Sequence, residues 1–402
     1  MDHKRGSFSG KIGFVLSAAG ASVGLGNIWR FPYLAAKYGG AIFLLVYIIL
    51  AMTFGYTMII AETSIGRMTG KSPVGAYKSF SDKPALRVGG WINAIIPILI
   101  VPYYSVIGGW VIKYLAEYLM GKAHLVAEDG YFSSFISNGV SSELCFLVFT
   151  AMTLAIIFAG VENGIERVSK IMMPILVVLS LIIAVYSVTR PGALEGVKYF
   201  LVPNLDNFSW MTVVSAMGQM FYSMSLAMGI MITYGSYTRD DVSMVKSVNQ
   251  IEIFDTGVAF LAGAMIIPAV YVFSGTEGMG AGPSLMFISL PKVFSAMGKA
   301  GTFVGILFFV TAIFATLSSC ISVLESIVAN CMEIFHTGRK KTVSVLSAVY
   351  LAASAIIALG YSIFYVEVEL PNGSTGQLLD IMDYISNSVM MPFIALLSTI
   401  LI

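Results

Sequence analysis

Charged residues are scarce in this chain, and their scarcity excludes an ordinary soluble globule. Lys, Arg, Asp and Glu make up 11% of the 402 residues, whereas 57% are apolar and the mean hydropathy is +0.85. Typical soluble domains carry about 25% charged residues. The composition therefore predicts a polytopic membrane protein in contact with the lipid bilayer, and we expect no nucleic-acid partner.

Cysteine and histidine are equally rare. Cys145, Cys320 and Cys331 all fall within apolar stretches, where cysteine acts as a small apolar residue rather than as part of a disulfide framework. The three histidines lie outside those stretches, which argues against a transition-metal cluster. No nucleophile and base stand at a credible spacing, so we expect no enzymatic activity and no organic cofactor.

Long apolar stretches dominate what is present, and ten of them could cross a bilayer, which needs about 20 apolar residues. They cover residues 10–34, 41–66, 88–120, 143–160, 167–189, 209–236, 243–274, 301–334, 342–364 and 376–402. A cytoplasmic N-terminus places 15 of the 23 Lys and Arg residues on the inner side, as the positive-inside rule favours. The sequence thus predicts a multi-pass protein of the cell membrane, plasma or inner, without a removable signal peptide.

The first apolar stretch contains a run that disfavours a continuous helix. Gly20, Gly24 and Gly26 weaken the helix, and Pro32 removes a backbone donor soon afterwards. A small-residue packing face would explain the glycines alone. It does not explain the amide of Asn27 and the charge that follows it, because non-helical backbone and polar groups persist at membrane depth only beside protein or water. We interpret this run as an unwound binding site.

The sixth apolar stretch is interrupted in a similar way, between Gln219 and Gly229, by Ser223 and Ser225. Five stretches precede residue 200 and five follow it, so the two halves would have opposite orientations. Paired interruptions in two inverted halves point to a transporter site near the membrane midplane. We therefore expect one transport domain, residues 1–402, with repeats of about 1–200 and 201–402.

Two further groups suggest cation ligands. Asp255 lies at membrane depth without a basic residue nearby in stretches six and seven, so sodium would offset its charge better than a structural partner would. Ser318 and Ser319 could merely bond back to their own helix. Facing a broken helix, however, two hydroxyls and free carbonyls would suit a hard cation such as sodium.

Several charged residues near the ends of the stretches are expected to form pairs. We expect Arg30 to pair with Asp383, and Arg5 with Glu333. Each pair could be a static bridge that holds the fold or a gate that opens and closes, and the sequence does not separate these alternatives.

Six ordered motifs carry a resemblance to a known family. They are the run from Gly24 to Pro32 with Gly39–Gly40, Glu62 before Gly66–Arg67, Tyr103–Tyr104, the run from Gln219 to Gly229, Leu317 to Ser319, and Asp380 to Asp383. Over its whole length the chain resembles the neurotransmitter:sodium symporters, in particular the bacterial sodium-dependent amino acid transporters. The resemblance implies an all-α, leucine-transporter-type fold with ten transmembrane helices in a 5+5 inverted repeat, helices one and six being broken. Further C-terminal spans, common in the family, are absent from this chain.

The resemblance also implies two sodium sites. The first would use the carbonyl of Ser22, the side chains of Asn27, Ser223 and Asp255, and the substrate carboxylate. The second would use the carbonyls of Gly20, Val23 and Ala315 and the hydroxyls of Ser318 and Ser319.

The implied substrate site surrounds these ions. Tyr104 would bond the substrate carboxylate, Tyr222 would cover the pocket, and the broken backbone from Ser225 would receive the amino group and side chain. The whole implied set comprises Ser22, Gly24, Gly26, Ile100, Tyr104, Tyr222, Ser223, Ser225, Leu226, Ala227, Met228, Cys320 and Val323. The outer gate would be Arg30 with Asp383 and Tyr222, and the inner gate Arg5 with Glu333 and Tyr237.

Departures from the family narrow the expected substrate. Animal members often hold chloride near Tyr47, Gln219 and Ser223, beside an Asn and a Ser that are Asp255 and Ala259 here. A fixed carboxylate could replace the anion, so we expect chloride-independent transport. Asp255 could also take up a proton when its site is empty, which leaves proton antiport as an option. Gly24 stands where monoamine transporters carry an acid, which favours a neutral, hydrophobic L-amino acid as the substrate.

These observations predict sodium-coupled symport by alternating access. Two alternatives use the same fold: an amino-acid-gated ion channel would conduct sodium without substrate, and a receptor would bind an amino acid without accumulating it. Saturable, sodium-driven accumulation would identify the symporter.

Overall fold

The computed structural model describes residues 6–81, 83–275, 283–371 and 375–401, and helices dominate them. The first half contains α1 (Lys11–Ser22), η1 (Gly26–Arg30), α2 (Phe31–Lys37), α3 (Ala41–Leu50), η2 (Ala51–Gly55), α4 (Tyr56–Thr69), α5 (Pro73–Phe80), α6 (Pro84–Leu119), η3 (Leu125–Ala127), α7 (Tyr131–Ser137), α8 (Gly139–Ala159), η4 (Val161–Glu166), α9 (Arg167–Val188) and α10 (Ala193–Leu201). The second half contains η5 (Leu205–Asn207), α11 (Trp210–Ser223), α12 (Ile230–Gly235), α13 (Met244–Ser274), η7 (Leu285–Ser289), α14 (Leu290–Ala296), α15 (Gly298–Phe335), α16 (Arg339–Ala358), η8 (Leu359–Tyr361), β1 (Val368–Glu369), β2 (Thr375–Gly376), α17 (Leu378–Asp383), η9 (Tyr384–Met390) and α18 (Met391–Leu401).

Within the described residues, eight helical segments are long and apolar enough to cross a membrane, and a bent pair makes a ninth. The bent pair joins residues 11–22 to 26–37 at an angle of 50°, which confirms the predicted break in the first stretch. Pro32 does not cause the break, contrary to our expectation. It lies in the first turn of α2, after the helix has resumed, where a missing amide hydrogen is tolerated.

The predicted span at 209–236 is divided into α11, of 14 residues, and α12, of 6 residues. Neither piece crosses a bilayer alone, since each residue adds about 1.5 Å of helix. The helix stops because Ser225, Ala227 and Gly229 have φ angles of 53°, 60° and 74°, which a right-handed helix excludes. The predicted second interruption is therefore present in the structure.

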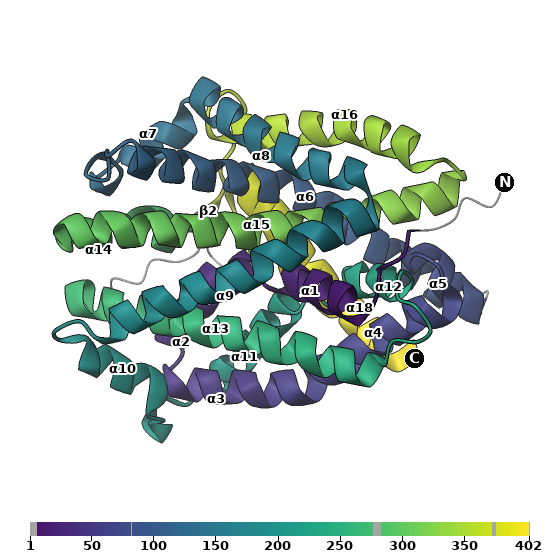
Figure 1. Cartoon of the computed structure of the whole chain (residues 1–402), viewed down its shortest axis with the longest axis horizontal. Coiled ribbons are helices and arrows are strands. Elements are labelled where there is room, and N and C mark those ends of the chain that lie inside the picture. The colour runs from purple at the N-terminus through teal and green to yellow at the C-terminus, as the bar shows by residue number, and fades with distance from the viewer. Residues whose placement is uncertain (1–5, 82, 276–282, 372–374, 402) are drawn as a thin grey trace.

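The long helices form a bundle with a buried centre (Figure 1). In α6 and α15, 78% of the apolar window is buried, compared with 33% in α8 and α16, so the former pair is central and the latter peripheral. The connecting helices α7, α10 and α14 lie at one end of the bundle, and α5 and both termini lie at the opposite end (Figure 1). The short α1 is held among α9, α13 and α15, close to the centre.

Candidate functional site

The first interruption frees two backbone carbonyls. In a continuous helix the amides of Gly24 and Leu25 would bond to the carbonyls of Gly20 and Ala21. Here the amide of Gly24 donates to Asn27 Oδ1, and that of Leu25 donates to the hydroxyl of Tyr104 on α6, each at 3.1 Å. Side chains thus satisfy the amides, and the two carbonyl oxygens are left for another partner.

The freed carbonyls converge on Ser319 of α15. Ser319 Oγ lies 3.3, 3.1 and 3.2 Å from the carbonyl oxygens of Gly20, Ala21 and Val23. A hydroxyl has one hydrogen and cannot serve three acceptors at once. Clustered oxygens with unused lone pairs are the ligands that a hard cation such as sodium prefers.

We call Ser319 Oγ with the carbonyls of Gly20, Ala21 and Val23 the Ser319 cluster. The adjacent Ser318 bonds back to its own helix, since Ser318 Oγ lies 3.1 Å from the carbonyl oxygen of Ala315 and 2.8 Å from that of Phe314. The cluster thus brings together Gly20, Val23 and Ser319 of the five residues predicted for the second sodium site, and the role of all five as sodium ligands stays a prediction. The carbonyl of Ala21 was not predicted.

A second polar group surrounds Asp255 of α13, which is fully buried. Its carboxylate accepts hydrogen bonds from Asn27 Nδ2 at 2.8 Å, from Ser223 Oγ at 2.9 Å and from the hydroxyl of Tyr47 at 3.1 Å. We call these four residues the Asp255 cluster. The cluster holds all three side chains predicted for the first sodium site, those of Asn27, Ser223 and Asp255, and their role as ligands, with the carbonyl of Ser22, stays a prediction.

The Asp255 cluster has an unbalanced negative charge when its carboxylate is ionised. Each of the three contacting side chains is neutral, and no Lys or Arg among the described residues forms an ion pair with Asp255. Burying an unpaired charge costs several kcal/mol, whereas a bound cation offsets it. The arrangement fits a monovalent cation beside the interrupted helix.

The second interruption uses a different polar partner. The amide of Ala227 donates to Glu62 Oε1 of α4 at 2.8 Å, and Glu62 is 1% exposed. Ser225 Oγ donates to the carbonyl of Ala21 at 2.9 Å. The second bond joins the two interruptions directly, so a change in one is transmitted to the other.

Gln219 connects the helix before the second interruption to the first. Its Nε2 donates to the carbonyl of Gly26 at 2.7 Å, while its Oε1 has no hydrogen-bond partner among the described residues. We associated this position with chloride only in the animal members of the family; here its amide contacts the backbone of η1.

A small cavity of about 20 Å³ lies between the two interruptions. Nine predicted substrate residues line it, together with Ala21 and Ser319: Ser22, Gly24, Gly26, Ile100, Tyr104, Tyr222, Ser225, Met228 and Val323. The volume suffices for about one water molecule. An amino acid can therefore enter only if lining side chains move.

Four predicted substrate residues do not line this cavity. Ser223 belongs to the Asp255 cluster, and Leu226 and Ala227 are buried in the turn between α11 and α12. The sulfur of Cys320 lies 3.5 Å from the hydroxyl of Tyr350 on α16, away from the cavity. The position of a residue along a helix therefore does not determine which polar group its side chain contacts.

Gly24 serves a purpose different from the one we expected. We predicted that it leaves room for a substrate carboxylate. A β-carbon at Gly24 would lie 2.5 Å from Ser319 Oγ and 2.7 Å from the Tyr104 hydroxyl. The space beside Gly24 is thus occupied, and the glycine allows these two side chains to approach the backbone.

Comparison with known proteins shows the family to which the chain belongs. The family model described as the Sodium:neurotransmitter symporter family matches residues 5–126 and 132–402. The chain belongs to this family. It is a multi-pass membrane transporter that couples transport to sodium, and its family comprises transporters rather than enzymes.

Relatives and a solved structure agree with this assignment. The uncharacterized sodium-dependent transporter YhdH of Bacillus subtilis is 35% identical, with 100% of this chain and 88% of the relative covered. The human sodium- and chloride-dependent GABA transporter 2 is 26% identical over 84% of this chain and 64% of its own length. The crystal structure of MhsT in complex with L-phenylalanine superimposes with a TM-score of 0.88, at 34% identity, over 98% of this chain and 89% of the other. The symporter thus has the leucine-transporter-type fold.

A second cavity, of about 340 Å³, contains the residues of the predicted outer gate. Arg30, Asp383 and Tyr222 all line it. Arg30 stacks on the Tyr222 ring, 4.9 Å from its centroid, and Asp383 accepts a hydrogen bond from Asn387 at 2.5 Å. Among the described residues Arg30 and Asp383 form no direct ion pair, although both line the same cavity, and their role as a gate stays a prediction. Tyr222, not Asp383, contacts the arginine.

The inner gate is only partly visible, because Arg5 lies outside the described residues. Glu333 accepts hydrogen bonds from the amide and hydroxyl of Ser72, at 2.7 and 2.6 Å. Tyr237 donates to Glu325 Oε1 at 2.8 Å, and Arg339 pairs with the same carboxylate at 2.6 Å. Neither Glu325 nor Arg339 belongs to the predicted inner gate.

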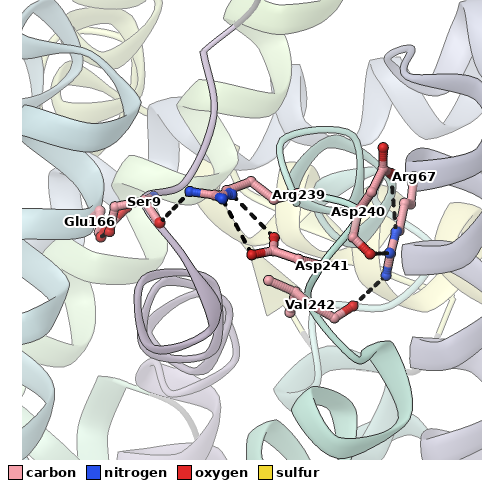
Figure 2. A network of polar contacts seen from close by, with 7 residues as sticks. All are labelled: Ser9, Arg67, Glu166, Arg239, Asp240, Asp241 and Val242. Atoms are coloured by element: carbon pink, nitrogen blue, oxygen red, sulfur yellow. Dashed lines mark hydrogen bonds and ion pairs between the residues drawn. The ribbon is translucent and has the colours of Figure 1, made fainter.

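A polar network that we did not predict lies beside the segment before α1 (Figure 2). Ser9 donates through its amide to Glu166 Oε2 at 2.7 Å, and its carbonyl accepts a bond from Arg239 at 3.2 Å. Arg239 in turn contacts Asp241 at 3.1 Å, and Arg67 donates to the carbonyl of Val242 at 2.5 Å. The network fixes the segment before α1 against the loop after α12. The network therefore connects the chain segments next to α1 and α12, which belong to the two interrupted spans.

Proposed function

We propose that this symporter carries neutral, hydrophobic L-amino acids, and that it does so without chloride. The observation that carries the proposal is the buried carboxylate of Asp255, bonded only by neutral donors beside a cavity with an apolar lining. A fixed negative charge at this place supplies what a chloride ion would supply next to sodium. The relative named as a GABA transporter is described as chloride-dependent.

The cavity supports the substrate class. Ile100, Met228 and Val323 give it an apolar lining. The Tyr104 hydroxyl oxygen accepts a bond from the amide of Leu25, and its hydrogen can be donated to a substrate carboxylate. An acidic side chain at Gly24, which would attract a monoamine, has no space. The solved structure of MhsT holds L-phenylalanine, which is in the same substrate class.

In the proposed mechanism, two sodium ions occupy the Asp255 and Ser319 clusters, and the substrate carboxylate completes the first of these sites. Sodium binding holds the interrupted helices in one arrangement, and release to the inside follows a rocking motion of the bundle. The two inverted repeats are residues 1–200 and 201–402, and the N-terminus is cytoplasmic. The cell membrane, plasma or inner, is the proposed location.

The test is uptake into proteoliposomes. A panel of labelled L-amino acids is offered with an inward sodium gradient, with choline in place of sodium, and with gluconate in place of chloride. We expect saturable accumulation of leucine-like or aromatic substrates that needs sodium and persists in gluconate. Loss of uptake in gluconate would refute chloride independence. A sodium current without substrate would indicate a channel instead, and binding without accumulation would indicate a receptor.

A further inference from the structure

A buried polar group lies behind the site, on the side away from the cavity. It consists of Ser105 on α6, Cys320 on α15 and Tyr350 on α16, which are 0%, 0% and 4% exposed. Tyr350 bonds to Ser105, and Cys320 Sγ lies 3.5 Å from the Tyr350 hydroxyl and 3.9 Å from Ser105 Oγ. One hydroxyl thus joins three helices.

One arrangement of the hydrogens satisfies all three side chains of this group. Ser105 Oγ donates to the carbonyl of Val101 at 2.8 Å, which uses its one hydrogen. Tyr350 must then donate to Ser105, and the thiol of Cys320 can donate to Tyr350. Each member therefore depends on the Tyr350 hydroxyl, which both accepts and donates.

Two members of the group directly follow residues of the binding site along the chain. Ser105 follows Tyr104, whose hydroxyl holds the amide of Leu25. Cys320 follows Ser319, whose hydroxyl contacts the freed carbonyls of α1. Ser319 and Tyr104 approach the same glycine from two different helices, so their spacing determines how the interrupted segment is held.

We infer that Tyr350 is a positioning residue for sodium binding. Through its two bonded neighbours it fixes α6 and α15 at the spacing that the Ser319 cluster needs. This inference rests on the proposed function, because it concerns the second of the two proposed sodium sites. It assigns a role to a residue of α16 that does not itself touch the site.

The test uses sodium alone as the probe. Purified full-length protein is unfolded thermally over a series of sodium concentrations, with choline keeping the ionic strength constant, because a ligand that binds the folded state raises its midpoint. Tyr350→Phe should raise the half-saturating sodium concentration about fivefold, the effect expected from the loss of one neutral hydrogen bond. Ser105→Ala should do the same, and the double variant should add little to either change.

Tyr118→Phe is the matched control. Tyr118 is a buried tyrosine on α6 whose hydroxyl has no hydrogen-bond partner among the described residues, so its sodium dependence should equal that of the wild type. A purely structural role for Tyr350 would lower the midpoint equally in sodium and in choline without changing half-saturation, and that result would overturn the inference alone. An equal shift in Tyr118→Phe would also overturn it. If sodium does not stabilise the wild type, the proposed sodium sites fail and the inference fails with them.

Discussion

The two interrupted spans present opposite ends of the peptide group to their surroundings. Between α1 and η1, the carbonyls of Gly20 and Ala21 face the hydroxyl of Ser319. Between α11 and α12, the amide of Ala227 faces the carboxylate of Glu62. The first is suited to a cation and the second is fixed by an acceptor from the protein itself. An inverted repeat can therefore produce two breaks of different chemistry, one for ions and one for shape.

The backbone conformations differ in the same sense. The first break needs no left-handed residue, since Val23 is extended and the helix resumes at Gly26. The second has three residues with positive φ, two of which are not glycine. Left-handed conformation costs a non-glycine residue about 1–2 kcal/mol, so the surrounding contacts must hold the second break in place.

Removing the charge beside the first break should have the largest effect. In Asp255→Asn the three neutral donors remain, but nothing offsets the charge of a bound cation. Truncating a buried charge interaction costs about 3–5 kcal/mol, so half-saturating sodium for amino-acid binding should rise at least about 100-fold in chloride-free buffer. Equilibrium binding of a labelled amino acid, over a sodium series, measures this.

Glu128→Gln is the control for this variant, because Glu128 is an exposed carboxylate outside the Asp255 cluster. It should leave the sodium dependence unchanged. Partial recovery of Asp255→Asn on adding chloride would strengthen the proposed replacement of anion by carboxylate. An unaltered sodium dependence in Asp255→Asn would refute the cation role of the cluster.

Filling the space at Gly24 should have the next largest effect. The β-carbon in Gly24→Ala would meet Ser319 Oγ at 2.5 Å and the Tyr104 hydroxyl at 2.7 Å, and would separate both from the backbone. Overpacking of this kind costs about 1–3 kcal/mol, which corresponds to a sodium affinity about 5- to 150-fold weaker. The same binding assay detects it.

Gly218→Ala is a matched variant on the other interrupted span. A β-carbon at Gly218 meets no atom within 4 Å, so binding should be preserved and the helix slightly favoured. Equal sodium affinity of the two alanine variants would show that the close approach of Ser319 and Tyr104 to Gly24 is not needed. It would thereby contradict the proposed role of the first break in binding the cation.

The sequence predicted the positions of both breaks, because glycine and polar residues in an apolar run conflict with a membrane helix. It also predicted most residues of both clusters, through a family resemblance confirmed over nearly the whole chain. It did not predict which of several possible partners a side chain contacts. Cys320 contacts Tyr350, Arg30 stacks on Tyr222, and Glu325 pairs with Arg339 at the start of α16. These choices depend on helix rotation and packing, which spacing along the chain does not determine.

Removing the acceptor at the second break should have a moderate effect on stability. In Glu62→Ala the amide of Ala227 loses its partner inside the protein, at a cost of about 1–3 kcal/mol. We expect the thermal midpoint to fall by several degrees equally in sodium and in choline, because Glu62 contacts neither cluster. Glu62→Gln, which keeps an acceptor oxygen, should fall less. A selective loss of sodium stabilisation in Glu62→Ala would show that the second break also serves the ions.

The smallest expected effect comes from relieving strain at the second break. Ala227 has a φ of 60°, a conformation that glycine adopts without steric cost. Ala227→Gly should stabilise the folded state by less than about 1 kcal/mol, because the greater freedom of glycine in the unfolded chain offsets part of the gain. Ala227→Val should destabilise it, since a β-branched residue is least compatible with this region. Thermal midpoints of the two variants, measured side by side, test the assignment: if valine is tolerated as well as glycine, the left-handed turn does not constrain the second break, and the difference between the two interruptions rests on their polar partners alone.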